Sequence, residues 1–184
     1  MNNINKLLHA ARFAAERHAG QLRKGARSEP YINHPLEVAN LIANVGGIED
    51  IDVLMASLLH DTIEDTGTKA EELIELFGET ACSYVLEVTD DKALPKARRK
   101  ELQIEHAPHL SPGAKVVKLA DKISNIRDVI ENPAVEWDIA RRREYVEWGV
   151  KVAAGLRGAN EYLEARFDLL IATAQRELDF RCAS

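Results

Sequence analysis

Hydrophobic residues recur every three or four positions along almost the whole of this 184-residue chain. That spacing places them on one face of an α-helix, whereas no stretch alternates polar and apolar residues for long enough to predict a β-strand. Helices are predicted over residues 4–20, 35–45, 50–64, 68–77, 79–88, 95–106, 111–130, 136–155 and 158–180. The pattern therefore predicts an all-α fold in which the helices pack as a bundle.

Residues with special backbone preferences mark several predicted helix ends. Pro35 suits the first position of a helix, and Thr68 suits a helix N-cap because its hydroxyl can accept from a free backbone N–H. The Gly, Pro and charge-rich segment 21–33 is a connection that has room for a short hairpin. No linker or internal repeat divides the chain, so residues 1–184 are expected to form a single domain.

Composition narrows the classes of partner. Hydrophobic residues make up 46% of the chain and charged residues 29%, a globular balance with no apolar run of membrane-spanning length. The first residues lack the features of a signal peptide, so a cytoplasmic location and no membrane contact are expected. The net charge of −6 argues against binding to nucleic acid, which needs a basic surface. Local groups of lysine and arginine are still able to attract one small anion.

The sequence LLHDTIEDT places His60, Asp61, Glu64 and Asp65 within six positions, directly after an apolar run. In one continuous helix, residues three and four apart share a face, so all four side chains are expected to address one point. Three neighbouring carboxylates repel one another, and burying them without partners is costly. A bound cation would turn this repulsion into coordination.

Two further residues extend this set into a candidate metal site. His34 lies in YINHP just before a predicted helix, and Asp121 lies in KLADKISN between positions of the core. With His60 and Asp61 they offer two imidazole nitrogens and two carboxylate oxygens, a set that suits Mn²⁺, with Fe²⁺ or Zn²⁺ as alternatives. A metal of this kind activates water and polarises phosphoryl oxygens, which predicts metal-assisted phosphate-ester hydrolysis.

Four segments together resemble one known family: PYINHP, LLHDTIEDT, VTDDKALPKARRK and SPGAKVVKLADKISNIRD. They are similar to the hydrolase domain of the RelA/SpoT family of HD-domain metal phosphohydrolases, and most closely to the small alarmone hydrolases of the metazoan Mesh type. The likeness spans about residues 5–165. It implies a Mn²⁺-dependent enzyme that removes the 3′-pyrophosphate of guanosine 3′,5′-bis(diphosphate), ppGpp, or its pentaphosphate analogue. The products would be GDP or GTP and pyrophosphate, without alarmone synthesis.

The resemblance also implies a role for each matching residue. The implied metal ligands are His34, His60, Asp61 and Asp121; the acidic pair that handles the attacking water is Glu64 and Asp65; the implied substrate contacts are Arg23 and Lys24 near the base, Asn125 at the nucleoside, and Lys96, Arg141 and Tyr145 at phosphate or ribose. The residues after Lys24 read Gly-Ala-Arg-Ser, where related domains carry other polar residues. Base selectivity therefore stays open.

Two alternatives remain on the sequence alone. The same metal motif occurs in HD proteins that act on deoxynucleoside triphosphates, cyclic dinucleotides or, for some alarmone hydrolases, nucleotides such as NADPH. The chain could also be an alarmone-binding helical module without turnover. Incubation of the protein and Mn²⁺ with the alarmone and with each of these nucleotides tests the first alternative. Nucleotide binding without pyrophosphate release would indicate the second. The oligomeric state is left open.

Overall fold

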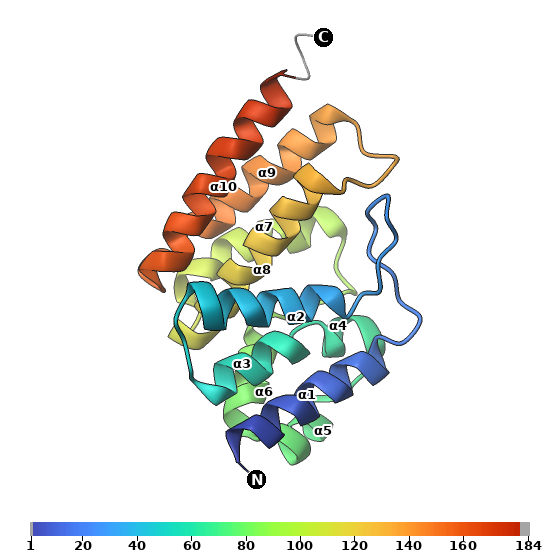
Figure 1. Ribbon diagram of the computed structural model, residues 1–184, viewed down its shortest axis with the longest axis vertical. Coiled ribbons are helices and arrows are strands. Elements are labelled where there is room, and N and C mark those ends of the chain that lie inside the picture. The colour runs from blue at the N-terminus through green and yellow to red at the C-terminus, as the bar shows by residue number, and fades with distance from the viewer. Residues whose placement is uncertain (1, 181–184) are drawn as a thin grey trace.

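Helices account for the regular structure of residues 2–180, the part of the chain that this computed structural model describes, which confirms the all-α prediction (Figure 1). The helices are α1 (Asn3–Arg17), α2 (Asn33–Asn40), the π-helical turn η1 (Leu41–Val45), α3 (Ile51–Leu59), α4 (Thr62–Thr66), α5 (Ala70–Phe77), α6 (Glu79–Val88), α7 (Lys96–His106), the 3₁₀ turn η2 (Ala107–His109), α8 (Pro112–Glu131), α9 (Ile139–Ala154) and α10 (Glu161–Phe180). None of the described helices is long and apolar enough to cross a bilayer.

Helix α8 is the central element of the bundle. It packs against α2, α3 and α6 on one side and against α9 and α10 on the other, so it joins the two ends of the molecule seen in Figure 1. Its apolar side chains, such as Leu119, Ile123 and Ile126, are fully buried with Leu58 and Leu59 of α3. Burial of apolar area is the main driving force for such a core. Polar groups on the same two helices are therefore held by rigid, well-packed elements.

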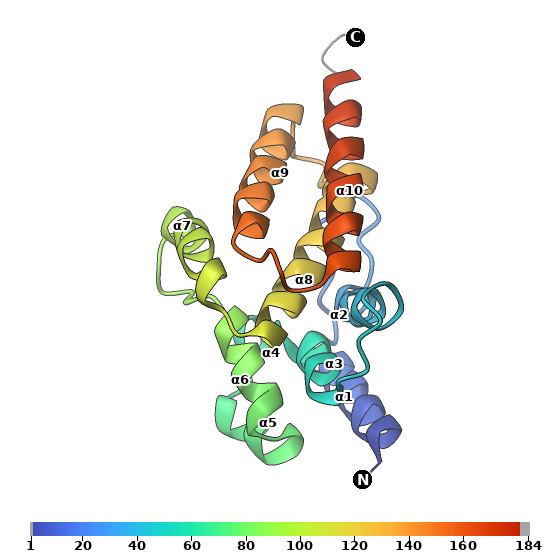
Figure 2. The same ribbon diagram turned by 90° about the vertical axis from the view of Figure 1, so that its left-hand side faces the viewer.

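Helix α7 differs from the others because it lies at the periphery, as Figure 2 shows. None of its residues is buried, and its main neighbours are η2 and α9. Trp148 of α9 donates its indole N–H to the backbone carbonyl of Lys100, 3.0 Å away. The Lys100 ammonium also lies 4.9 Å from the centre of the Trp148 ring, within the range of a cation–π interaction. Partly buried Ile104 packs against the core, and these polar and cation–π contacts add to the attachment of α7.

The predicted helix 50–64 is wrong in one respect: it is interrupted at His60 and Asp61, between α3 and α4. The imidazole of His60 bonds to the carbonyl of Ser57 at 2.7 Å, and the hydroxyl of Thr62 bonds to the carbonyl of Leu59 at 2.7 Å. Side chains that bond to carbonyls of the preceding turn compete with the main-chain hydrogen bonds of a helix. His60 and Asp61 consequently sit in a turn between two helices.

Two predicted helix starts also differ from the structure. Helix α2 begins at Asn33, two residues before Pro35, so the proline lies inside the first turn rather than at its first position. Thr68 does not cap α5, because extended Lys69 holds the N-cap position and makes no side-chain capping bond. The Thr68 hydroxyl instead bonds to the hydroxyl of Thr66 at 2.8 Å. Both starts are thus set by the preceding turns rather than by these two residues.

The segment 21–33 forms a hairpin-like loop with one antiparallel bridge, between Leu22 and Pro30, and no extended strand. It rests on the segment that follows α8, as Figure 1 shows on the right. Asn132 is the main contact: its side-chain oxygen accepts from the backbone N–H of Arg27 at 3.0 Å. A Cβ atom on Gly25 would lie 2.1 Å from the Asn132 amide nitrogen, so only glycine permits this approach.

Candidate metal centre and nucleotide cavity

Four of the predicted side chains converge in the interior, from α2, the α3–α4 turn and α8. The Nε2 atom of His34 lies 3.2 Å from Asp121 Oδ1 and 3.6 Å from Asp61 Oδ2. The Nε2 atom of His60 lies 3.1 Å from Asp61 Oδ2 and 3.8 Å from Asp121 Oδ1. His34, His60 and Asp121 are each at most 7% exposed. The ligand atoms of His34, His60 and Asp121 all lie within 4.8 Å of one another, and Asp61 Oδ2 adjoins this group through its contacts with both imidazoles.

The other nitrogen of each imidazole is occupied by a hydrogen bond. His60 Nδ1 donates to the carbonyl of Ser57, 2.7 Å away. The Ser124 hydroxyl donates to Glu37 Oε2 at 2.9 Å, so it accepts the Nδ1–H of His34, also at 2.9 Å. These hydrogen bonds leave both Nε2 atoms to face the aspartates, and His60 Nε2 is buried without a hydrogen-bond partner among the described residues. Imidazoles fixed in this way are typical metal ligands, so the site fits a divalent cation.

Electrostatics support the same interpretation. Burial acts to lower the pKa of His60, but the Asp61 carboxylate outweighs it and the pKa rises to about 9. Burial alone would raise the pKa of Asp121, yet Lys122 and the two histidines hold it well below its usual value. Burial lowers the pKa of His34. In the absence of a cation, the centre thus keeps a proton on His60 between ionised carboxylates, and a divalent ion would replace that proton.

Three hydrogen bonds hold the two aspartates in place. The Tyr31 hydroxyl donates to Asp61 Oδ2 at 2.7 Å, and the Asn125 amide donates to Asp121 Oδ1 at 2.5 Å. Lys122, which is 3% exposed, donates to Asp121 Oδ2 at 3.1 Å. Sequence reasoning assigned no role to Tyr31 or Lys122, although Tyr31 lies in the same PYINHP segment as His34 and Lys122 adjoins Asp121. These contacts direct one oxygen of each aspartate towards the histidines.

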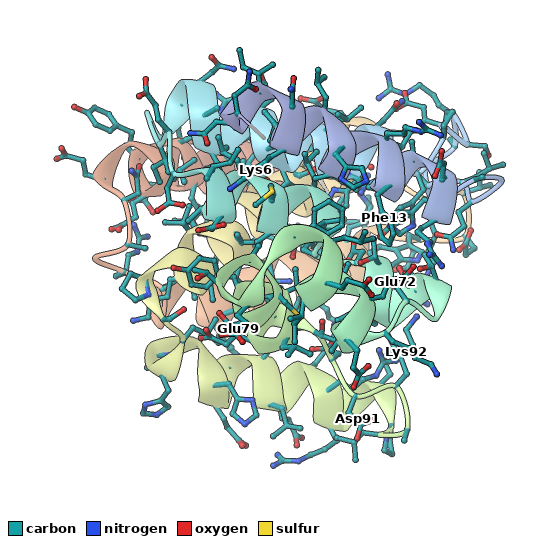
Figure 3. The ribbon with its side chains drawn as sticks, turned by 90° about the horizontal axis from the view of Figure 1, so that it is seen from below. Lys6, Phe13, Glu72, Glu79, Asp91 and Lys92 are labelled. Carbon is teal, nitrogen blue, oxygen red and sulfur yellow. The ribbon has the colours of Figure 1, made fainter. Side chains whose placement is uncertain are left out.

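Glu64 and Asp65 belong to α4, beyond the interruption, and are held by the segment between α6 and α7. Glu64 accepts the backbone N–H of Asp90 at 3.1 Å and lies 3.6 Å from the Arg99 guanidinium. Asp65 pairs with Lys92, which Figure 3 labels in this segment. Burial raises the pKa of Glu64. The acidic pair is therefore positioned by the segment between α6 and α7 and by Arg99 of α7, and not by one continuous helix through His60.

A cavity of about 550 Å³ opens beside this centre. It contains six of the predicted site residues: Arg23, Lys24, Asp65, Lys96, Asn125 and Tyr145. Its walls also include Gln21, Tyr31, Asp128, Asn132 and Trp137. None of the four proposed metal ligands lines the cavity itself. Tyr31 and Asn125, which do line it, bond directly to the two aspartates, so the candidate metal centre adjoins the cavity at the end that these two residues form. Its volume falls within the range of small-molecule sites.

The guanidinium of Arg23 is fixed within the cavity. Its Nε and Nη2 atoms donate to Asp128 Oδ2 at 2.8 and 2.5 Å, and Nη2 lies 3.3 Å from Asn125 Oδ1. The Arg23 side chain is only 10% exposed. Asp128 was not identified from sequence, where it reads as one more polar position at the end of a helix. The hydrogen bonds to Asp128 hold the planar Arg23 guanidinium in one orientation, in which it can stack on a purine.

Cations gather at the open side of the cavity. Lys24 and Lys96 are exposed, and partial burial together with Arg141 and Lys24 lowers the pKa of Lys96. Arg141 is not itself a lining residue; its guanidinium lies over the ring of Trp137, 4.8 Å from the ring centre. Tyr145 lies beside Trp137, with ring centres 5.5 Å apart. Trp137 packs against the core and also forms a wall of the cavity.

Comparison with known proteins shows which family the chain belongs to. The model of the HD domain matches residues 10–146, so the chain belongs to the HD-domain family. The chain is 52% identical over 162 residues to the guanosine-3′,5′-bis(diphosphate) 3′-pyrophosphohydrolase MESH1 of Xenopus tropicalis, covering 88% of this chain and 90% of that protein. The human protein of the same name is 52% identical over 159 residues, with 86% and 89% covered. Within the HD-domain family, the chain thus belongs to the MESH1 group.

A solved structure agrees with this assignment. It is that of a protein described as "A metazoan ortholog of SpoT hydrolyzes ppGpp and plays a role in starvation responses". It superposes with a TM-score of 0.89 at 43% sequence identity and covers 94% of this chain and 96% of its own. The predicted family resemblance is confirmed by these relatives.

Proposed function

We propose that this chain removes the 3′-pyrophosphate of ppGpp, or of its pentaphosphate analogue, and releases GDP or GTP and pyrophosphate. The observation that carries the proposal is the convergence of two imidazole nitrogens and two carboxylates at one end of a cavity whose open side is cationic. The names of the MESH1 relatives point to the same reaction. A small anionic guanosine nucleotide is therefore the proposed substrate.

His34, His60, Asp61 and Asp121 are the proposed ligands of one Mn²⁺ ion. Mixed nitrogen and oxygen donors suit Mn²⁺, with Fe²⁺ or Zn²⁺ as competitors. When bound, the ion would lower the pKa of a water and polarise a phosphoryl oxygen of the substrate. The hydrogen bonds from Tyr31, Asn125 and Lys122 keep the aspartates in place, so little rearrangement is needed for binding.

Glu64 and Asp65 are the proposed residues that handle the attacking water. Burial raises the pKa of Glu64 above the ordinary value of a glutamate, which makes its carboxylate a better proton acceptor near neutral pH. The backbone N–H of Asp90 holds one of its oxygens and Arg99 lies near the other. Asp65 lines the cavity and is suited to orient the water next to the substrate.

Substrate recognition is divided between the two sides of the cavity. Arg23, held by Asp128, is proposed to stack on the base, with Lys24 nearby. Asn125 is proposed to contact the nucleoside, and Tyr145 the ribose or a phosphate. Lys96 and Arg141 are proposed to neutralise phosphate charge, which an acidic protein must supply locally. A guanidinium can stack on any purine, so this contact does not select the base. We expect the metal centre and the phosphate contacts to determine which nucleotide is cleaved.

A direct assay tests the proposal. The purified protein is loaded with Mn²⁺ and incubated separately with ppGpp, dGTP, NADPH and a cyclic dinucleotide, and products are resolved by ion exchange. We expect pyrophosphate and GDP from ppGpp, with the activity lost on chelation and restored by Mn²⁺. Preferred cleavage of another nucleotide would contradict the substrate assignment. Calorimetric binding of ppGpp without any pyrophosphate release would instead identify a binding module.

A further inference from the structure

His18 is a buried histidine that the proposed mechanism does not use. It follows α1 directly and is 2% exposed. Its Nδ1 atom lies 2.8 Å from Gln21 Oε1, and its ring stacks on Tyr31 with centres 4.8 Å apart and planes inclined by 29°. Its Nε2 atom is buried and has no hydrogen-bond partner among residues 2–180. A phenylalanine would fill the same space without leaving a buried nitrogen unsatisfied.

The hydrogen bond to Gln21 leads to the proposed acidic pair. The Gln21 amide nitrogen donates to the backbone carbonyl of Asp65 at 3.1 Å. This donation fixes the orientation of the amide, so Oε1 faces His18 and Nδ1 of His18 must carry the proton. A chain of two hydrogen bonds thus runs from the His18 ring to the main chain of α4 at Asp65.

The stacked face of the ring leads to the candidate metal centre. Tyr31 lies flat against His18 and donates its hydroxyl to Asp61 Oδ2 at 2.7 Å. The backbone N–H of Tyr31 also bonds to the carbonyl of Gln21 at 2.9 Å, which ties the tyrosine to the same short segment. The position of Asp61 therefore depends, through one phenol, on the His18 ring.

We infer that His18 is a positioning residue that sets two parts of the site at once: through Gln21 the placement of Asp65, and through Tyr31 the placement of Asp61. The unsatisfied Nε2 atom supports this inference, because a residue selected only for packing would not keep it. Only the expected effect on kcat rests on the proposed function. The effect of His18 on metal binding can be measured without any substrate.

Two variants of His18 separate its effect on Asp65, through Gln21, from its effect on Asp61, through Tyr31. His18→Phe keeps a flat ring against Tyr31 but cannot donate to Gln21. We expect Mn²⁺ affinity close to that of the wild type, an unfolding temperature equal or higher, and a kcat about tenfold lower with little change in KM. His18→Ala also removes the stacking, and we expect its Mn²⁺ affinity to fall about tenfold in addition, by the magnitude seen for residues that support metal ligands. Gln21→Leu should reproduce the kinetic defect of His18→Phe.

The matched control is His9→Phe. His9 lies on α1, nine residues before His18, and packs its ring near Phe77, with ring centres 5.1 Å apart. This substitution should leave metal affinity and kcat unchanged. Calorimetry with Mn²⁺ alone, thermal unfolding and steady-state kinetics are measured on all four variants. Absence of ppGpp turnover in the wild type would refute the proposed function, while the calorimetry would still test His18.

The inference is overturned if folded His18→Phe retains the wild-type kcat. It is also overturned if His18→Phe loses Mn²⁺ affinity as strongly as His18→Ala, because the ring face would then have no separate role. If His18→Ala does not fold, His18→Phe and Gln21→Leu still decide the kinetic part, and Tyr31→Phe decides the metal part by removing the hydroxyl from Asp61. Wild-type Mn²⁺ affinity in Tyr31→Phe would contradict it.

Discussion

The two ends of the cavity are built in opposite ways. At the metal end, His34, His60 and Asp121 are buried, and each is fixed by a hydrogen bond, His34 from another helix and the other two from residues three or four positions away. At the open end, Lys24 and Lys96 are exposed on a loop and on the peripheral helix α7 (Figure 2). The first arrangement is complete before any ligand arrives, whereas the second leaves cations free for the substrate to order. Changes at the metal end should abolish function, and changes at the open end should weaken it by degrees.

Removal of a buried ligand is expected to have the largest effect. His60→Ala or Asp121→Ala takes away one of four donors and leaves the remaining charges of the centre unbalanced. We expect loss of metal retention and of activity together, measured by metal analysis and by pyrophosphate release. His109→Ala, at an exposed histidine, is the matched control and should behave as the wild type. Metal retained at the wild-type level in His60→Ala would refute its role as a ligand.

Glu64→Gln should separate metal binding from chemistry. The amide is close in shape to the carboxylate but cannot accept a proton, so metal content should be unchanged while kcat falls by about 10²- to 10⁴-fold. Glu75→Gln is the control, because Glu75 is exposed on α5. Turnover of Glu64→Gln at the wild-type rate with Mn²⁺ bound would show that another group accepts the proton.

The pH profile should report the same carboxylate. Glu64 must be ionised to accept a proton, and burial raises its pKa, so activity should fall as the pH drops through a value above that of an ordinary glutamate. Below that value kcat should decrease about tenfold per pH unit. Metal content is measured at each pH, since loss of Mn²⁺ at low pH would imitate this decrease. An acidic limb unchanged in Glu64→Gln would contradict the assignment.

At the open end the expected effects are smaller. Lys96→Ala should raise KM for ppGpp about three- to tenfold with little change in kcat, and the difference should shrink at high salt because exposed charges are screened. Arg98→Ala, in the same first turn of α7, is the matched control, since Arg98 pairs with Glu101 and Glu105 instead. A complete loss of activity in Lys96→Ala would mean that the two ends do not differ as described.

The sequence predicted the all-α fold, and it singled out His34, His60 and Asp121, whose ligand atoms lie within 4.8 Å of one another in the structure, for an identifiable reason. The helical spacing of apolar residues extends through most of the chain, and His34, His60, Asp61 and Asp121 are chemically unusual next to core positions. Long, periodic helices such as α8 follow from that pattern alone. The interruption at His60 does not, because it depends on side-chain bonds to the preceding carbonyls.

Other features depend on tertiary contacts that no local pattern reveals. Asp128 gains its role only because the loop of Arg23 folds back onto α8, and Trp137 reaches the cavity only through the segment after α8. Thr68 has the chemistry of an N-cap, yet its hydroxyl bonds to Thr66. Asp128 and Trp137 look ordinary in the sequence because their partners lie far away in the chain, whereas the partner of Thr68 is only two residues away.

The location of bound manganese tests the central claim most directly. Crystals grown with Mn²⁺ are measured at the manganese absorption edge, and the anomalous difference map gives the position of the ion independently of any assay. We predict one strong peak per chain within coordination distance of the Nε2 atoms of His34 and His60 and of the carboxylates of Asp61 and Asp121. A peak elsewhere, or full occupancy of the protein without a peak among these four side chains, would contradict the account.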